Sequence, residues 1–188
     1  MNMRFIRNVP GIPPLIEELA EYADLWNFYN FRTKGYGDSP HRDVSDIWLR
    51  YRDWSELNMD AMRDFGNTPT ADYTHWYATA HLMPSIKQMI ENIAVTENLL
   101  EFGACLITKI PPGKCVFPHS DNDYHATHFK DKYLLLLQSE PGQTFNYENE
   151  THTGKTGDLF HFNNNVTHWV NNYSDDDRIS LIIAGRLE

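Results

Sequence analysis

His119 and Asp121 stand two residues apart at the end of a short apolar run, in the stretch PPGKCVFPHSDND that covers 111–123. Side chains two residues apart on an extended chain project from the same face of a strand. An imidazole and a carboxylate placed side by side suit either a polar strand end that faces water or two ligands of one metal ion. The second interpretation requires at least one further protein ligand.

Two later histidines are candidates for that ligand. His168 opens the strand-like run HWVNN after the turn NNN, and His161 lies inside the strand-like run DLFHF. Two histidines and one carboxylate leave positions open on non-haem Fe(II), where a co-substrate and oxygen can bind. A lone histidine is more often a surface or hydrogen-bonded core residue, so the residue types alone leave both histidines open.

Arg178 and Ser180 lie two apart at the start of RISLIIAG, a strand otherwise suited to burial. A buried arginine needs an anionic partner, and its planar fork suits a carboxylate. The acids at 175–177 could supply an ion pair, but they directly precede Arg178 and resemble turn residues on the solvent side. We therefore expect Arg178 and Ser180 to bind a dicarboxylate co-substrate.

The composition limits the class of protein. A chain of 188 residues fits one domain, and 41% hydrophobic with 13% aromatic residues is enough for a core. The net charge of −10 disfavours a nucleic-acid partner. No apolar run approaches the roughly 20 residues of a membrane span, and we expect no signal peptide. Two cysteines, Cys105 and Cys115, form no framework, which predicts a cytoplasmic location.

The elements that must position these residues differ between the two halves. Apolar spacing predicts helices over 13–32 and about 71–101, the second restarting at Pro84. Between them, DIWLRYRDW predicts a strand with Ile47, Leu49 and Tyr51 on one face. From Ala104 onward, short strand-like runs alternate with turns such as PPG and KTGD. We expect a single domain over residues 1–188, in which an α-rich N-terminal half (residues 1–103) packs on a β-rich core (residues 104–188).

The joint pattern resembles the Fe(II)/2-oxoglutarate-dependent oxygenases, and more closely the aspartyl/asparaginyl β-hydroxylase family, over about 104–186. The blocks TKIPPGKCVFPH and NETHTGKTGDLFHFNNNVTH carry the resemblance. Phe162, six residues before the distal histidine, aligns His168 rather than His161 with the metal ligand, and Arg178 matches an arginine ten residues later. The resemblance implies a double-stranded β-helix (a jelly roll, cupin-like) core, and so an α+β fold with the α-rich N-terminal half.

Carried over by position, the resemblance implies roles for particular residues. His119, Asp121 and His168 are the expected Fe(II) ligands; some family members have glycine at the position of Asp121. Arg178 and Ser180 are expected to bind the distal carboxylate of 2-oxoglutarate. Further co-substrate positions are Thr108, Lys132 and Tyr133.

The implied activity is that of a dioxygenase that consumes 2-oxoglutarate and O2 and hydroxylates an unactivated C–H bond. Its substrate would be a peptide or protein side chain or a free amino acid. Two other classes remain open from the sequence. A cupin-like metal isomerase or hydrolase would need the metal ligands but not Arg178 with Ser180, and a non-catalytic β-sandwich interaction module would need neither.

Overall fold

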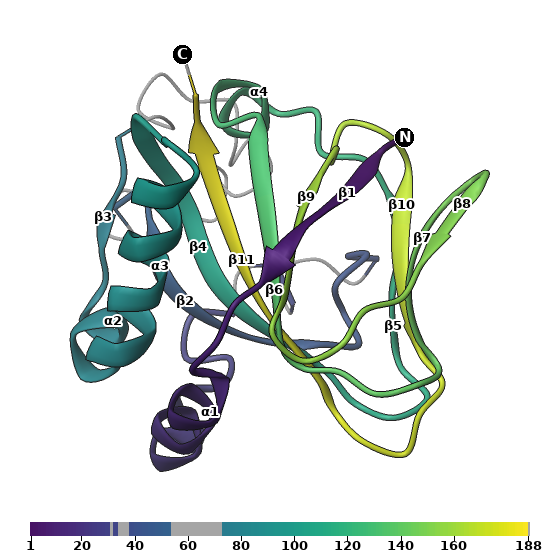
Figure 1. Cartoon of the computed structure of the whole chain (residues 1–188), viewed down its shortest axis with the longest axis horizontal. Coiled ribbons are helices and arrows are strands. Elements are labelled where there is room, and N and C mark those ends of the chain that lie inside the picture. Colours follow the sequence, from purple (N-terminus) through teal and green to yellow (C-terminus); the bar gives the residue numbers. More distant parts are fainter. Residues whose placement is uncertain (31, 34–37, 54–72, 188) are drawn as a thin grey trace.

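The structure, a computed structural model, describes residues 1–30, 32–33, 38–53 and 73–187. Two antiparallel sheets face each other in the manner of a jelly roll (Figure 1). The larger sheet has the order β1-β9-β6-β11-β4-β2-β3, and the smaller has the order β5-β10-β7-β8. The strands are Met3–Asn8 (β1), Ser45–Tyr51 (β2), His75–Trp76 (β3), Glu101–Ile110 (β4), Cys115–His119 (β5), Asp131–Gln138 (β6), Gln143–Tyr147 (β7), Glu150–His152 (β8), Asp158–Phe162 (β9), His168–Asn172 (β10) and Arg178–Arg186 (β11).

The helices are short, and α1 and α3 cover one face of the larger sheet. The helical elements are Ile12–Glu21 (α1), Ala23–Leu25 (a 3-10 turn), Ala78–Leu82 (α2), Pro84–Thr96 (α3) and Tyr124–His128 (α4). Prolines open α1 and α3, where their missing N–H groups cost nothing. The first helix ends at Glu21 rather than at residue 32, because Tyr22 leaves helical geometry (φ −117°, ψ 40°).

In the described residues, no helix is long and apolar enough to cross a membrane.

The expectation of an α-rich N-terminal half is wrong. Residues before 101 contribute β1, β2 and β3 to the same sheet as β4, β6, β9 and β11 from the second half. The strand β1 covers the outer edge of β9, and β2 extends the sheet beyond β4, so edge strands that would otherwise lie open are paired. The single-domain organisation stays a prediction.

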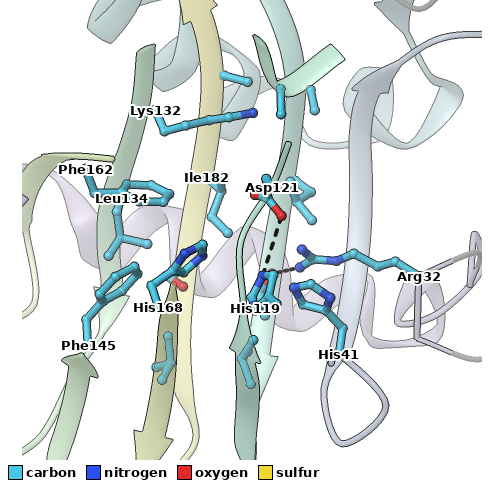
Figure 2. A pocket seen from close by; sticks show the side chains of 18 of the residues that line it. Arg32, His41, His119, Asp121, Lys132, Leu134, Phe145, Phe162, His168 and Ile182 are labelled. Carbon is cyan, nitrogen blue, oxygen red and sulfur yellow. Dashed lines mark hydrogen bonds and ion pairs between the residues drawn. The ribbon is translucent and has the colours of Figure 1, made fainter. Parts of the chain in front are cut away.

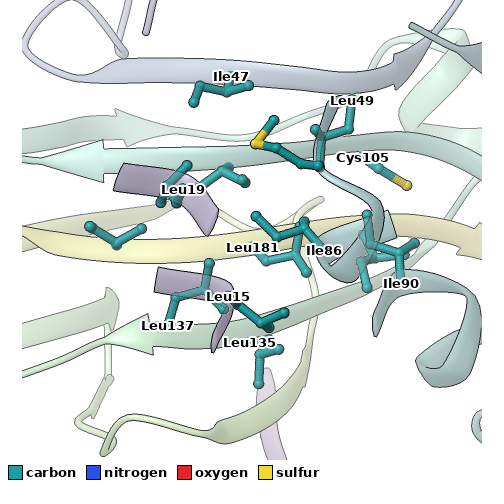
Figure 3. Close-up of a cluster of buried hydrophobic side chains, with 14 of the residues drawn as sticks. Leu15, Leu19, Ile47, Leu49, Ile86, Ile90, Cys105, Leu135, Leu137 and Leu181 are labelled. Atoms are coloured by element: carbon teal, nitrogen blue, oxygen red, sulfur yellow. The ribbon is translucent and has the colours of Figure 1, made fainter. Parts of the chain in front are cut away.

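The larger sheet has two different faces. One face packs under α1 and α3, with Leu135 and Leu181 against Leu15, Leu19 and Ile86 (Figure 3). The other face looks toward the smaller sheet, where Leu134 and Leu136 of β6 meet Val116, Phe145 and Val170. Strand alternation therefore decides which side chains reach the space between the sheets.

A bulge in β2 changes that alternation locally. The pairing of β2 with β4 shifts between Trp48 and Arg50, and an extra residue at a bulge reverses the faces that follow. Ile47 and Leu49 lie under the helices as expected. Tyr51 instead lies with Trp48 in a cluster on the inner face, so its expected orientation is corrected.

Candidate metal and co-substrate site

A cavity of about 240 Å³ lies between the two sheets. On the larger sheet its wall consists of cross-strand rows. The row of Thr108 and Ser180 is followed by that of Leu106, Ile182 and Leu134, and then by that of Ala184 and Lys132. The opposite wall comes from β5, β10 and β7 of the smaller sheet. The cavity thus collects side chains from strands far apart in the sequence.

His119, Asp121 and His168 meet at this cavity (Figure 2). His119 ends β5 and His168 begins β10, and the two are paired residues of these antiparallel strands. Asp121 follows just after β5, with Oδ1 3.6 Å from Nε2 of His119. One potential ligand atom from each of the three lies within 4.8 Å of the others. This is the donor set that a non-haem Fe(II) ion takes.

Backbone carbonyls select the tautomer of both imidazoles. The Nδ1–H of His119 donates to the carbonyl of Phe117 (2.8 Å), and that of His168 donates to the carbonyl of Val166 (2.9 Å). A carbonyl only accepts, so each Nδ1 carries the proton and each Nε2 keeps its lone pair for a metal. Burial and the neighbouring His119 lower the pKa of His168, which favours the neutral ligand.

The carboxylate of Asp121 is held in place by Asn164. The side-chain amide of Asn164 donates to Oδ2 of Asp121 (3.2 Å), and the Asp121 backbone N–H donates to the Asn164 carbonyl (2.9 Å). Burial by itself would raise the pKa of Asp121. Interactions with the neighbouring His119 and Lys132 side chains outweigh it and keep the pKa below its ordinary value. The group is therefore an anion ready to bind a cation.

Arg178 is buried in the same cavity without an acidic partner. Its side chain is 4% exposed, and Nη1 donates to the hydroxyl of Ser180 (3.2 Å). Within the described chain it forms no ion pair, including with the acids at 175–177, and burial lowers its pKa to about 10. A desolvated guanidinium in this state is costly unless an anion binds it.

Thr108 reaches the cavity, but its hydroxyl is already engaged. It donates to Oδ1 of Asp46 (2.9 Å) and accepts from Nη2 of Arg32 (2.7 Å). Arg32 also binds Asp46 through Nε (2.6 Å) and Nη2 (2.9 Å). Thr108 therefore belongs to a network with Arg32 and Asp46.

Lys132 and Tyr133, expected together as co-substrate residues, lie on opposite faces of β6. Lys132 lines the cavity, whereas Tyr133 packs under the helices with Leu135 and its ring contacts His161. That expectation is corrected for Tyr133, because successive strand residues alternate in direction. His161 is likewise turned away from the cavity and bonds Asp131 (3.3 Å).

Arg32 and His41 also line the cavity, and sequence reasoning did not find them. Both lie before β2, in a stretch where the sequence offers no motif that distinguishes them. From the sequence, the only indication was the general tendency of binding residues to lie on loops. The structure reveals their position through the contacts of Arg32 with Asp46 and of His41 with His119.

The fold resembles that of solved iron and 2-oxoglutarate oxygenases. A prolyl hydroxylase from Trichoplax adhaerens, in complex with a hypoxia inducible factor peptide fragment, matches with a TM-score of 0.55 and 12% identity, over 98% of this chain and 83% of that one. The viral collagen prolyl hydroxylase of Paramecium bursaria Chlorella virus-1, in its 2OG complex, matches with a TM-score of 0.54 and 10% identity, over 98% of this chain and 95% of that one. A Pseudomonas putida prolyl-4-hydroxylase matches with a TM-score of 0.52 and 16% identity, over 100% of this chain and 93% of that one.

These structural matches define the class as a jelly-roll fold of the 2-oxoglutarate oxygenase type. The sequence itself matches the model of the aspartyl/asparaginyl beta-hydroxylase family over residues 16–186, and the chain belongs to that family. No curated protein matches the sequence significantly. The protein is accordingly an oxidoreductase, a hydroxylase that uses Fe(II) and 2-oxoglutarate. The isomerase and the non-catalytic module are thereby set aside.

Proposed function

We propose that His119, Asp121 and His168 bind the Fe(II), and that Arg178 with Ser180 binds the distal carboxylate of 2-oxoglutarate. The reaction is the hydroxylation of a peptide or protein side chain or of a free amino acid. One observation carries the proposal: a buried guanidinium, which forms no ion pair within the described residues, shares a cavity with the three potential ligands. The three ligands provide a place for the metal, and the guanidinium provides a place for the carboxylate of a co-substrate that binds to that metal.

The residues fit the ion and its co-substrate chemically. Two imidazoles with free Nε2 atoms and one carboxylate on the same side leave coordination positions open. Fe(II) with 2-oxoglutarate and oxygen supplies the oxidising chemistry for an unactivated C–H bond. The chain's task is placement: Asn164 orients Asp121, and the apolar wall of Leu106, Leu134 and Ile182 restricts water.

Arg178 and Lys132 lie at opposite ends of the cavity wall formed by the larger sheet. Lys132 pairs with Ala184, six residues along β11 from Arg178, which is roughly 20 Å at about 3.3 Å per residue. Figure 2 shows the Lys132 side chain crossing β11 rather than following it. The four carbon–carbon bonds of 2-oxoglutarate, each about 1.5 Å, span only about 5 Å. We assign the co-substrate to Arg178 because its fork suits a carboxylate and Ser180 adds a hydroxyl.

Lys132 is then left for the primary substrate. Its side chain is 7% exposed and forms no hydrogen bond or ion pair in the described residues. The small side chains of Ala104 and Ala184 leave room beside it, between Tyr51 and the start of α4 at Tyr124. The family's name points to aspartyl and asparaginyl side chains, whose oxygens would accept from an ammonium. This supports an acidic or amide side chain as substrate.

The test is turnover with defined substrates under Fe(II) and 2-oxoglutarate. Peptides that contain aspartate or asparagine are compared with the free amino acids and with peptides that contain proline, and a mass increase of one oxygen is read by mass spectrometry. We expect hydroxylation of an acidic or amide side chain and a raised KM in Lys132→Met. Hydroxylation of proline alone, with Lys132→Met unaffected, would contradict the substrate assignment.

A further inference from the structure

The stretch before β2 brings Arg32 and His41 to the metal ligands (Figure 2). The His41 ring lies edge-on to that of His119, with centroids 4.6 Å apart. Arg32 reaches the same side of the cavity over the ring of Trp48 (5.8 Å). Neither residue is needed to complete the three-ligand set, so their presence calls for another role.

Asp46 and Thr108 hold the Arg32 guanidinium through Nε and Nη2 and leave its Nη1 without a partner among the described residues. Nε and Nη2 bind the two carboxylate oxygens of Asp46, and Nη2 also donates to Thr108. Asp46 is completely buried, so it forms a rigid base for the guanidinium. In the described residues Nη1 of Arg32 forms no hydrogen bond, and the same holds for the His41 imidazole. Two potential donors therefore face the cavity next to His119.

The spacing of the two arginines fits a short dicarboxylate. Arg32 donates to Thr108, and Arg178 donates to Ser180. Thr108 and Ser180 are directly paired on β4 and β11, and such partners have Cα atoms about 5 Å apart. Two carboxylates joined by four carbon–carbon bonds are separated by about the same distance. Each arginine thus binds one hydroxyl of a directly paired set.

We propose that Arg32 and His41 bind the carboxylate at the keto-acid end of 2-oxoglutarate, while Arg178 binds the other end. This inference rests on the proposed function. Arg32 and His41 are positioning residues: they contact the co-substrate and direct its keto-acid end toward His119, Asp121 and His168. Thr108 and Asp46 act through Arg32, which explains why the Thr108 hydroxyl is engaged.

The experiment compares two ligands that share only one end. Fe(II)-loaded protein is titrated anaerobically by calorimetry with 2-oxoglutarate and with 2-oxobutyrate, a keto acid without the distal carboxylate. Arg32→Gln should weaken both ligands by a similar factor of roughly tenfold or more, since a charged hydrogen bond is lost. Arg178→Gln should weaken 2-oxoglutarate strongly and 2-oxobutyrate little.

Two further variants separate binding from structure. Arg42→Gln is the matched control, because Arg42 lies close to His41 in the chain but stacks on Phe117 and does not line the cavity; it should bind both ligands normally. His41→Phe keeps the Arg32–Asp46 pair and should weaken both ligands, as Arg32→Gln does.

The outcomes distinguish the keto-acid end from the distal end. If Arg178→Gln behaves as expected but Arg32→Gln and His41→Phe bind 2-oxobutyrate normally, the inference on the keto-acid end is overturned and the proposed function stands. A loss of thermal stability without a change in affinity would mean that Arg32 only neutralises Asp46, and would also overturn it. If Arg178→Gln leaves 2-oxoglutarate binding unchanged, the proposed function itself is contradicted, because Arg178 then does not bind the distal carboxylate.

Discussion

His119 and His168 are paired residues of adjacent antiparallel strands, and their rings lie 4.4 Å apart between centroids. Each donates Nδ1–H to the carbonyl two residues before it. The same local bond thus sets both tautomers, and both Nε2 atoms stay available near Asp121. A binding site for a cation follows from strand pairing and two backbone carbonyls.

The choice between the two candidate histidines gives the first prediction. His168→Ala should lose Fe(II) affinity by more than the roughly 10–100-fold that removal of an outer partner costs. His161→Ala should keep it, because His161 bonds Asp131 on the other face of the larger sheet. Iron content after anaerobic reconstitution and desalting measures both. Iron retained by His168→Ala and lost by His161→Ala would reverse the assignment.

Asn164 provides a second prediction, on how the carboxylate is held. Asn164→Ala removes the amide that donates to Asp121, and we expect Fe(II) affinity to fall by about tenfold. Asn165→Ala is the control, since Asn165 is the exposed neighbour in the same turn. Equilibrium dialysis measures both affinities. Equal affinities in the two variants would show that Asp121 needs no such support.

Lys132 gives a prediction about stability. A buried ammonium without an ion pair is costly, so Lys132→Met should stabilise the metal-free protein by on the order of 1–3 kcal/mol. Lys130→Met, at an exposed position, should change little. Urea unfolding of the three proteins at neutral pH measures the difference. A destabilised Lys132→Met would mean that the attraction between Lys132 and the nearby Asp121 outweighs the cost of burying the ammonium.

The difference in free energy of unfolding between wild type and Lys132→Met should depend on pH, because protonation of Lys132 is linked to folding. Burial lowers the pKa of Lys132 below its ordinary value of 10.5. Below the lowered pKa both folded and unfolded states carry the proton, so the cost of burial is fully present. Between the lowered pKa and 10.5 the unfolded state binds more protons, and stability rises with pH. The gap between wild type and Lys132→Met should therefore narrow toward pH 10.5, and a constant gap would contradict this cause.

Much of the site was predictable from the sequence because it depends on local spacing. His119 and Asp121 share a strand end, and Arg178 and Ser180 share a strand face; both follow from a period of two. The position of Phe162 favours His168 over His161 as the metal ligand, and that assignment stays a prediction. These inferences required only that the predicted segments be strands, and the structure has strands in the second half of the chain.

The rest depended on contacts between residues far apart in the chain. Asp46 lies 62 residues from Thr108, yet their side chains bond, and no local pattern shows that pairing. The α-rich first half was predicted from helical spacing, which could not show that β1 pairs with β9 across the chain. Tyr133 was misplaced because the exact start of β6 decides its face. Tyr51 was misplaced because a bulge reverses its face.

The central claim is that one cavity holds the metal with His119, Asp121 and His168, and the co-substrate with Arg178. Its most direct test is anaerobic titration of Fe(II)-loaded protein with 2-oxoglutarate, followed through the visible charge-transfer band. Comparing wild type with Arg178→Ala isolates the guanidinium, which touches no metal ligand. Asp175→Asn, Asp176→Asn and Asp177→Asn are the controls for an ion pair.

We predict that Arg178→Ala retains Fe(II) but binds 2-oxoglutarate roughly 30- to several-thousand-fold more weakly, as expected for about 2–5 kcal/mol from a truncated charged pair. Arg178→Lys should recover only part, because an ammonium cannot reproduce the fork. The three aspartate variants should match wild type. Unchanged 2-oxoglutarate affinity in Arg178→Ala, with a loss of stability that an aspartate variant reproduces, would contradict the central claim.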